Sequence, residues 1–488
     1  MAFLIGGANS ASGVYEISNS VRYNQGDSPE LYFTPSSDMA SRRTMTWSFW
    51  CKRGSLNGTG GYMFVMALDD DGAGFNPVIR FNDSGSGDTM RFTAHNESTP
   101  LRFITNAAFR DPLAWYHFVI MMDTSQSTNT NRLKLYINGT QTTDFSEVYY
   151  GTQNDDTNWG KGSRSHDIGF MDIASESQTS KYFDGYLADF YYINAQNLTA
   201  SDFGEFNDNG VWVPKKYTGS FNSDSFKLEF QETGTSADAN GIGADTSGSG
   251  NHMTVANLAA TDICTDSPTN NFATLNPLMA GRGSTLSEGN CKVSGESDNN
   301  YDVSTFGSSM KFYFEWKLDE AHSGGNGIKL SVLHEDELAQ NDNYGNFQTK
   351  YVKTYTNSND GKYQDGNGSN PSGGGSLTRA TLNDIIMVAC DGGNGKVWFG
   401  VNGTWLSSGD PANGTGGFHG SWSASMETGI YFACPIYSGT NGAGQINFGN
   451  PSFSISSGNA DANGYGNFEY AVPSGFYALC TKNLAEYG

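Results

Sequence analysis

Short apolar runs separated by clusters of Gly, Asn, Asp and Ser extend along this chain, and this pattern constrains the fold more than any other feature. Runs such as 46–51, 62–68 and 115–122 are rich in aromatic and β-branched residues, as β-strands are. No long stretch repeats apolar residues at the 3.6-residue period of an amphipathic helix. Gly accounts for 61 of the 488 residues, which suits many tight turns. The pattern predicts an all-β chain.

One series of features occurs in both halves of the chain: an apolar run that ends in Asp, an alternating strand, and an Asn-Gly pair. The two copies span 115–139 and 384–403. Asn-Gly favours a type I′ hairpin turn, because both residues tolerate positive φ. The repetition predicts two consecutive antiparallel β-sandwich domains of the jelly-roll type. The alternative is a chance similarity of two hairpins.

The length of the chain allows two hydrophobic cores. A connector rich in Ser, Thr, Asn and Pro follows Asn257, so we place the domain boundary near residue 265, between a domain at 15–264 and a domain at 265–488. Residues 1–14 lie outside both. We expect them to dock to a larger particle or to a neighbouring subunit through the apolar residues Phe3, Leu4 and Ile5.

The charge balance limits the classes of partner. The chain has 28 basic and 51 acidic residues, a net charge of -23 at pH 7, which repels nucleic acid and anionic lipid. Neutral glycans remain compatible with it. No segment approaches the ~18 apolar residues of a membrane span, and the N-terminus lacks the basic and apolar regions of a signal peptide. We therefore expect a protein that is made in a cytosol, without nucleic-acid binding or membrane insertion.

Several segments resemble known families. Residues 20–50, 115–117, 133–139 and 183–190 look like a concanavalin A-like, laminin-G-type domain. Residues 312–316, 384–391, 395–405 and 445–449 resemble strands of a SPRY domain. The connector 265–272 and the ending 475–484 are similar to segments of virion proteins of tailed bacteriophages, and this resemblance spans 13–484.

The phage resemblance implies a structural protein of the virion that displays lectin-like domains for host attachment, in a tail fibre or appendage. Decoration of the head surface is the alternative within this class. The expected partners are other virion proteins and a host surface glycan, and virion symmetry favours a homo-oligomer. A carbohydrate-binding module or glycoside hydrolase of concanavalin A-like fold, and a SPRY-type peptide adaptor, are the alternatives from other classes.

No catalytic residue is predicted, and we do not expect an enzyme. Hydrolases of the resembled fold carry the order E-x-D-x-x-E, whereas the nearest carboxylates, Glu315, Asp319 and Glu320, have a different spacing. Alternation places Glu315 on a solvated strand face with Tyr313. The His residues form no Ser/His/Asp or H-E-x-x-H arrangement, and His117 is expected in the core or at a sheet edge.

Loop aromatics are the candidate ligand-binding residues, because a sugar ring stacks on an exposed aromatic ring. Four of them lie among Gly, Asn and Ser: Trp159, Tyr363, Trp405 and Trp422. The alternative role for each of these rings is to fill space in a hydrophobic core or in a contact between subunits.

Metal binding has one weak candidate. Laminin-G domains sometimes bind calcium through loop Asp residues, which the cluster Asp69, Asp70 and Asp71 would supply, although the rest of a calcium loop is missing. A hydrated turn is the alternative, and no other cofactor is expected. The six Cys residues lack metal-ligand spacing, so reduced core cysteines are predicted.

Overall fold

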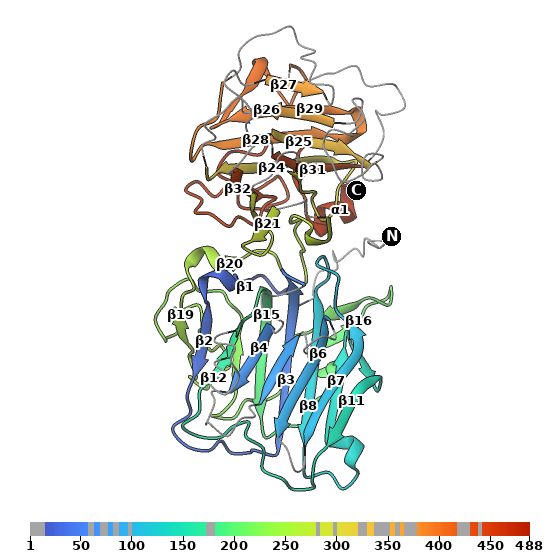
Figure 1. Cartoon of the computed structure of the whole chain (residues 1–488), viewed down its shortest axis with the longest axis vertical. Coiled ribbons are helices and arrows are strands. Elements are labelled where there is room, and N and C mark those ends of the chain that lie inside the picture. The colour runs from blue at the N-terminus through green and yellow to red at the C-terminus, as the bar shows by residue number, and fades with distance from the viewer. Residues whose placement is uncertain are drawn as a thin grey trace. The chain divides into compact units, whose positions relative to one another are not determined.

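The computed structural model describes residues 15–56, 63–68, 77–81, 87–95, 100–171, 181–279, 284–295, 300–320, 329–335, 352–356, 362–365, 378–416, 430–437 and 442–488. The described chain forms two compact units, which we call the N-terminal unit (15–269) and the C-terminal unit (270–488). The described residues form antiparallel sheets with a single α-helix, α1 (Thr481–Tyr487), and one parallel strand pair (Figure 1). The predicted all-β fold is confirmed.

The N-terminal unit contains two eight-stranded sheets. The first sheet has the order β10 (Thr140–Thr142), β9 (Leu133–Ile137), β8 (Tyr116–Asp123), β3 (Thr44–Arg53), β15 (Gly185–Asn194), β1 (Ser20–Tyr23) and β20 (Ile263–Cys264), and β18 (Phe226–Leu228) also pairs with β15. The second sheet has the order β11 (Phe145–Tyr150), β7 (Leu101–Ala108), β6 (Thr89–His95), β5 (Val78–Phe81), β4 (Met63–Leu68), β12 (His166–Ile168), β2 (Glu30–Phe33) and β19 (Thr254–Ala256). Two small hairpins accompany them, β13 (Phe170–Met171) with β14 (Lys181–Tyr182) and β16 (Gly204–Phe206) with β17 (Trp212–Pro214).

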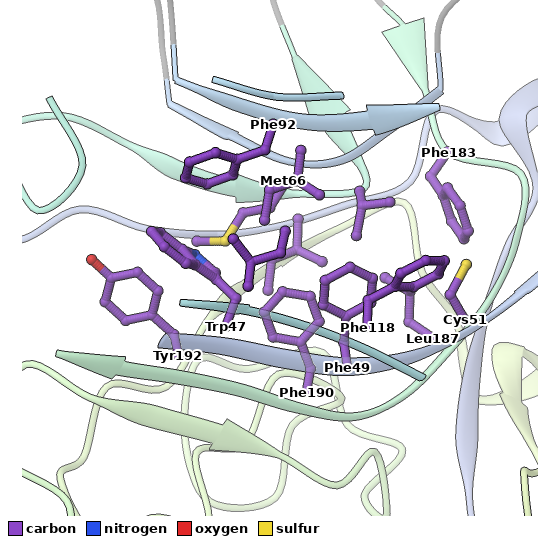
Figure 2. Close-up of a cluster of buried hydrophobic side chains, with 14 of the residues drawn as sticks. Trp47, Phe49, Cys51, Met66, Phe92, Phe118, Phe183, Leu187, Phe190 and Tyr192 are labelled. Atoms are coloured by element: carbon purple, nitrogen blue, oxygen red, sulfur yellow. The ribbon is translucent and has the colours of Figure 1, made fainter. Parts of the chain in front are cut away.

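Aromatic side chains fill the space between these two sheets (Figure 2). Trp47 of β3 meets Phe92 of β6 edge to face, with the ring centroids 5.3 Å apart, so side chains from both sheets interdigitate. Phe49 stacks on Phe190 of the neighbouring strand β15 at 5.3 Å. Each such buried side chain contributes roughly 1.5–3 kcal/mol relative to an exposed one. The alternating strands read from the sequence therefore supply the core of a sandwich.

The C-terminal unit contains an eight-stranded and a five-stranded sheet. The third sheet has the order β21 (Ser284–Ser287), β22 (Lys292–Gly295), β32 (Gly442–Asn447), β24 (Lys311–Leu318), β28 (Ile385–Asp391), β29 (Lys396–Val401) and β30 (Thr404–Trp405), and β33 (Tyr477–Ala478) pairs with β24. The fourth sheet has the order β23 (Asn300–Tyr301), β31 (Tyr431–Tyr437), β25 (Lys329–His334), β26 (Val352–Thr356) and β27 (Lys362–Asp365).

The two Asn-Gly hairpins have the same geometry. Asn138 and Gly139 have φ values of 46° and 82°, and Asn402 and Gly403 have φ values of 47° and 81°, as a type I′ turn requires. In each, the Asn side-chain oxygen also accepts a hydrogen bond from the strand that precedes the hairpin. The donor is the His117 amide of β8 at 2.8 Å in one copy and the Ile385 amide of β28 at 2.9 Å in the other. The prediction of one hairpin design in both halves is confirmed.

The connector between the units belongs to the N-terminal unit as far as Thr269, whereas the sequence analysis placed the boundary near residue 265. Asp266 lies buried against β3, where its carboxylate accepts hydrogen bonds from the Lys52 ammonium at 2.7 Å and from the Trp115 indole at 3.1 Å. Its backbone oxygen accepts a hydrogen bond from the Ser20 hydroxyl at 2.6 Å. These contacts account for the later boundary, because they fix the connector to the first sheet.

Five of the six cysteines are free thiols inside the two units: Cys51, Cys264, Cys291, Cys390 and Cys480. All five are buried, and burial raises the pKa of the Cys51 thiol and raises that of Cys480 to about 12. The prediction of reduced core cysteines is confirmed for these five, while the Cys434 side chain lies outside the described residues.

Candidate ligand-binding site

Trp159 does not belong to a surface site, contrary to the sequence analysis. Its side chain is fully buried, and its ring meets those of Trp47 and Phe92 with centroid distances of 5.1 and 6.3 Å. The indole N–H donates to the backbone oxygen of Thr93 at 3.2 Å. The Gly and Asn residues beside it in sequence form the loop that carries this ring into the core, so a polar sequence context does not imply exposure.

The other predicted aromatics also differ from loop platforms. Tyr363 lies in strand β27, paired with Tyr355 of β26, and not in a loop. Trp405 lies in β30, is half-buried, and packs against Tyr313 at a centroid distance of 6.4 Å. Trp422 lies outside the described residues, as do the two further sets of predicted site residues, Asp69, Asp70 and Asp71, and Phe3, Leu4 and Ile5.

Glu315 is buried, so the prediction of a solvated strand face is wrong. Its carboxylate accepts hydrogen bonds from the Tyr313 hydroxyl at 2.9 Å, from the Asn447 amide at 3.3 Å, and from the backbone amides of Glu469 and Tyr470 at 3.0 and 2.8 Å. Burial raises the pKa of this carboxyl, and the four donors counteract that rise. A carboxylate whose oxygens are occupied in this way holds the segment around residue 469 and has no free position for a substrate.

His117 is buried, as predicted, and touches a serine. Its Nε2 lies 2.8 Å from the Ser48 hydroxyl oxygen, while its Nδ1 accepts a hydrogen bond from the Trp212 indole at 3.0 Å. Because Nδ1 is the acceptor, the proton of the neutral ring is on Nε2, which donates to Ser48. Burial lowers the pKa of His117 to about 3. This pair therefore lacks the tautomer that would let histidine take a proton from serine.

The described residues contain no group of three or more His, Cys, Asp or Glu side chains that could hold a metal ion. In the same ranges, no helix has the length and hydropathy needed to cross a membrane.

An open, shallow hollow lies at one end of the edge strand β11, with a volume of about 350 Å³, within the size range of small-molecule sites. None of its lining residues carries a charge at neutral pH: Pro100, Asn129, Val148, Tyr149, Tyr150, Gly151 and Thr152. The lining combines two phenol rings with amide, hydroxyl and backbone groups. It suits a ligand that has both an apolar face and hydroxyl groups.

Tyr149 is the exposed aromatic residue of this hollow. Its side chain is 44% exposed, and it lies opposite Arg102 of β7, whose guanidinium is 5.0 Å from the centre of the ring. Arg102 also forms an ion pair with Glu147 on the same strand as Tyr149. These contacts fix the orientation of the ring, because a cation is attracted to the aromatic face.

The backbone around the hollow is fixed by a buried arginine. The Arg132 guanidinium donates to the backbone oxygens of Gly151 and Gln126, each at 2.8 Å. The Gly151 amide donates to the Pro100 oxygen at 3.0 Å, and Gly151 has a φ of 62°, a conformation that favours glycine. The hollow is therefore built by three separate segments of chain that hydrogen bonds hold together.

Tyr149 and Tyr150 were not among the site residues predicted from the sequence. The sequence did contain a signal for an aromatic site here, because the run 145–150 has three aromatic residues and is followed by a glycine. The run could not be recognised as an edge strand from its sequence, since pairing with β7 decides its place in the sheet.

Comparisons with known proteins agree with this architecture. Residues 25–202 match the family described as the concanavalin A-like lectin/glucanases superfamily. No curated protein matches the chain. With the two-sheet core, the family match shows that the N-terminal unit has a concanavalin A-like, laminin-G-type fold.

Three solved structures illustrate the similarity. The SPRY domain of human HERC1 is 15% identical, with 35% of this chain and 96% of that chain covered and a TM-score of 0.28. A heptameric SAP-like pentraxin from Limulus polyphemus is 14% identical, with 38% and 80% covered and a TM-score of 0.28. Domains LG4-5 of the mouse laminin alpha1 chain are 8% identical, with 96% and 100% covered and a TM-score of 0.29.

Proposed function

We propose that this lectin-like protein binds a neutral glycan, without turning it over, in the hollow beside Tyr149, and that it does so as a structural protein on the surface of a tailed-phage particle. The observation that carries the binding proposal is the exposed Tyr149 ring above an uncharged hollow. An aromatic ring offers a surface for the apolar face of a sugar. The phenol, amide and hydroxyl groups of the hollow are partners for sugar hydroxyls.

The charge of the protein supports the choice of a neutral ligand. The net charge of -23 disfavours the approach of sulfated or carboxylated glycans at low ionic strength. The only arginine beside the Tyr149 ring, among the described residues, is Arg102, and Glu147 neutralises it. A neutral hexose polymer is therefore the ligand class that fits best.

Three observations support a role in binding without catalysis. The carboxylate of Glu315 is buried and occupied by four donors. The tautomer of His117 is unsuited to activating Ser48. Glycoside hydrolysis needs two carboxyl groups facing one bond, and the hollow contains no carboxyl group in its lining.

The virion part of the proposal rests on the resemblance of 265–272 and 475–484 to segments of phage virion proteins. Both segments contain residues that fix the fold, Asp266 in the first and Ala478 and Asn483 in the second, where the Asn483 amide donates to Asp461 at 2.7 Å and to the Ala478 oxygen at 2.9 Å. Labelling of purified phage particles with an antibody to this protein, viewed by electron microscopy, should show it on the particle surface. Particles without label would contradict this part of the proposal.

Tyr149→Ala is expected to weaken binding to neutral glycans at least tenfold, which is about 1.4 kcal/mol, because it removes the stacking surface. Binding of the wild-type chain to an array of neutral polysaccharides identifies the probe, and calorimetry then compares the variants. Tyr149→Phe should keep most of the affinity, since the ring remains. Phe206→Ala is the matched control, because Phe206 is a 54% exposed aromatic residue elsewhere in the same unit.

Equal affinity of Tyr149→Ala and Phe206→Ala would place the glycan elsewhere and refute the hollow as its site. Release of reducing ends from any polysaccharide of the array would refute binding without turnover.

A further inference from the structure

Strand β11 is unlike the other edge strands. It has six residues, whereas no other strand at the end of one of the four sheets exceeds four residues in the described ranges. Along the described part of the chain, no strand pairs with the outer side of β11. Very short edges limit unwanted strand pairing. The outer backbone groups of β11 therefore form the longest available template for a further strand.

The residues of β11 also lack the usual protection of an edge. The strand contains no Lys and no Pro, and its one charged side chain, Glu147, is paired with Arg102. Natural edge strands are commonly blunted by Lys, Pro or an inward-pointing charge. One bulge, between Phe145 and Glu147, is the only such device here.

The core side of β11 is incompletely covered. Phe145, Val148 and Tyr150 pack against the core of the N-terminal unit, yet each remains half-buried because the second sheet ends at this strand. An added strand would remove more of this apolar surface from water, at about 25 cal/mol per Å². The edge thus combines free backbone groups with apolar side chains that are only partly buried.

We propose that β11 pairs in antiparallel orientation with β11 of a second copy of this chain, across a twofold axis, and joins the two second sheets into one. An isologous contact of this kind closes on itself and produces a dimer. The argument for a second copy is the self-complementarity of the strand. With Val148 facing Val148 of the second copy, Glu147 lies opposite Tyr149 and Ser146 lies opposite Tyr150, and no like charges meet.

The alternative register centred on Glu147 would place two carboxylates directly opposite each other, which destabilises a strand pair. Side chains stand perpendicular to a sheet, so pairing through the backbone edge brings Glu147 of the second copy beside Tyr149 without covering the outer face of the ring. The dimer therefore goes beyond glycan binding and can be tested separately from it.

Ser146→Lys is the test variant. Ser146 is exposed and lies at the bulge, outside the backbone register of β11 with β7. Its hydroxyl donates to the Ile104 oxygen of β7 at 3.2 Å, so the change removes this one side-chain hydrogen bond and keeps the backbone pairing of the second sheet. Lys at an edge opposes the addition of a strand. Sedimentation velocity of the full chain should give twice the 52.7 kDa chain mass for the wild type and the single-chain mass for Ser146→Lys.

Gln141→Lys is the matched control, because Gln141 is an exposed residue of the three-residue edge strand β10, and it should remain dimeric. Hydrogen exchange gives a second measurement: the β11 amides of the wild type should lose protection on dilution. A wild-type chain that is monomeric at all concentrations would overturn the proposal, and so would a Ser146→Lys chain that stays dimeric. Glycan binding should persist in Ser146→Lys, with an affinity altered by the loss of the second copy's Glu147 from beside Tyr149. Loss of the dimer without loss of glycan binding separates the two proposals.

Discussion

Glu315→Ala is expected to lower the free energy of unfolding of the C-terminal unit by about 4 kcal/mol or more, because it removes the acceptor of two buried side-chain donors and of two half-buried backbone amides, at roughly 1–3 kcal/mol for each unsatisfied buried group. The donors come from three separate segments: the hydroxyl of Tyr313 on the same strand, the amide of Asn447 on β32, and the backbone of Glu469 and Tyr470. Urea unfolding followed by circular dichroism and tryptophan fluorescence measures the loss.

Glu315→Gln should have a smaller effect, about 2–3 kcal/mol, because the side chain keeps its shape and one acceptor oxygen but turns an NH₂ group towards donors. Glu320→Gln is the control, since Glu320 is an exposed residue of the turn after the same strand, and its unfolding curve should match that of the wild type. If Glu315→Ala unfolded at the same urea concentration as Glu320→Gln, the Glu315 carboxylate would not stabilise the segment around residue 469 as described.

Asp266→Ala is expected to destabilise the N-terminal unit by about 3–5 kcal/mol, because it removes the carboxylate that the buried Lys52 ammonium contacts at 2.7 Å. The exposed fraction of the side chain is 2% for Lys52 and 0% for Asp266, so water cannot replace the lost carboxylate. The change also removes the acceptor of the Trp115 indole. Chemical unfolding of the full chain, with each transition assigned by its far-ultraviolet and fluorescence signal, measures the effect.

The double variant Lys52→Met with Asp266→Ala should recover a large part of this loss, because it removes the buried ammonium as well. Asp156→Ala is the control: Asp156 pairs with Arg43 at 2.7 Å, but both side chains are largely exposed, and such pairs contribute little. A double variant no more stable than Asp266→Ala would show that the connector is held by contacts other than this ion pair.

The hairpins and most strands of the fold could be predicted from local sequence, because their signals are local. An apolar run followed by Asn-Gly specifies a strand and a turn whatever lies around it, and both copies have the predicted geometry. Buried cysteines and the buried His117 were predictable for the same reason, since each lies within an apolar run.

The errors concern residues whose surroundings come from distant parts of the chain. The strand containing Glu315 alternates like a half-exposed strand, but Phe468 packs on Tyr313 at a centroid distance of 5.0 Å, and the segment around it covers the second face. Trp159 is carried into the core by its loop. The hollow beside Tyr149 depends on three segments, and only the folded sheet brings them together.

The burial of the thiols has a consequence for the environments in which this protein can persist. Reaction with oxidants requires an accessible thiolate, and the five described free cysteines are buried, with the pKa of Cys51 and Cys480 raised. These thiols stabilise the fold as small apolar groups and not as covalent links. These five cysteines are therefore expected to form no disulfide bond in either a reducing or an oxidising medium. The fold around them should be the same in both.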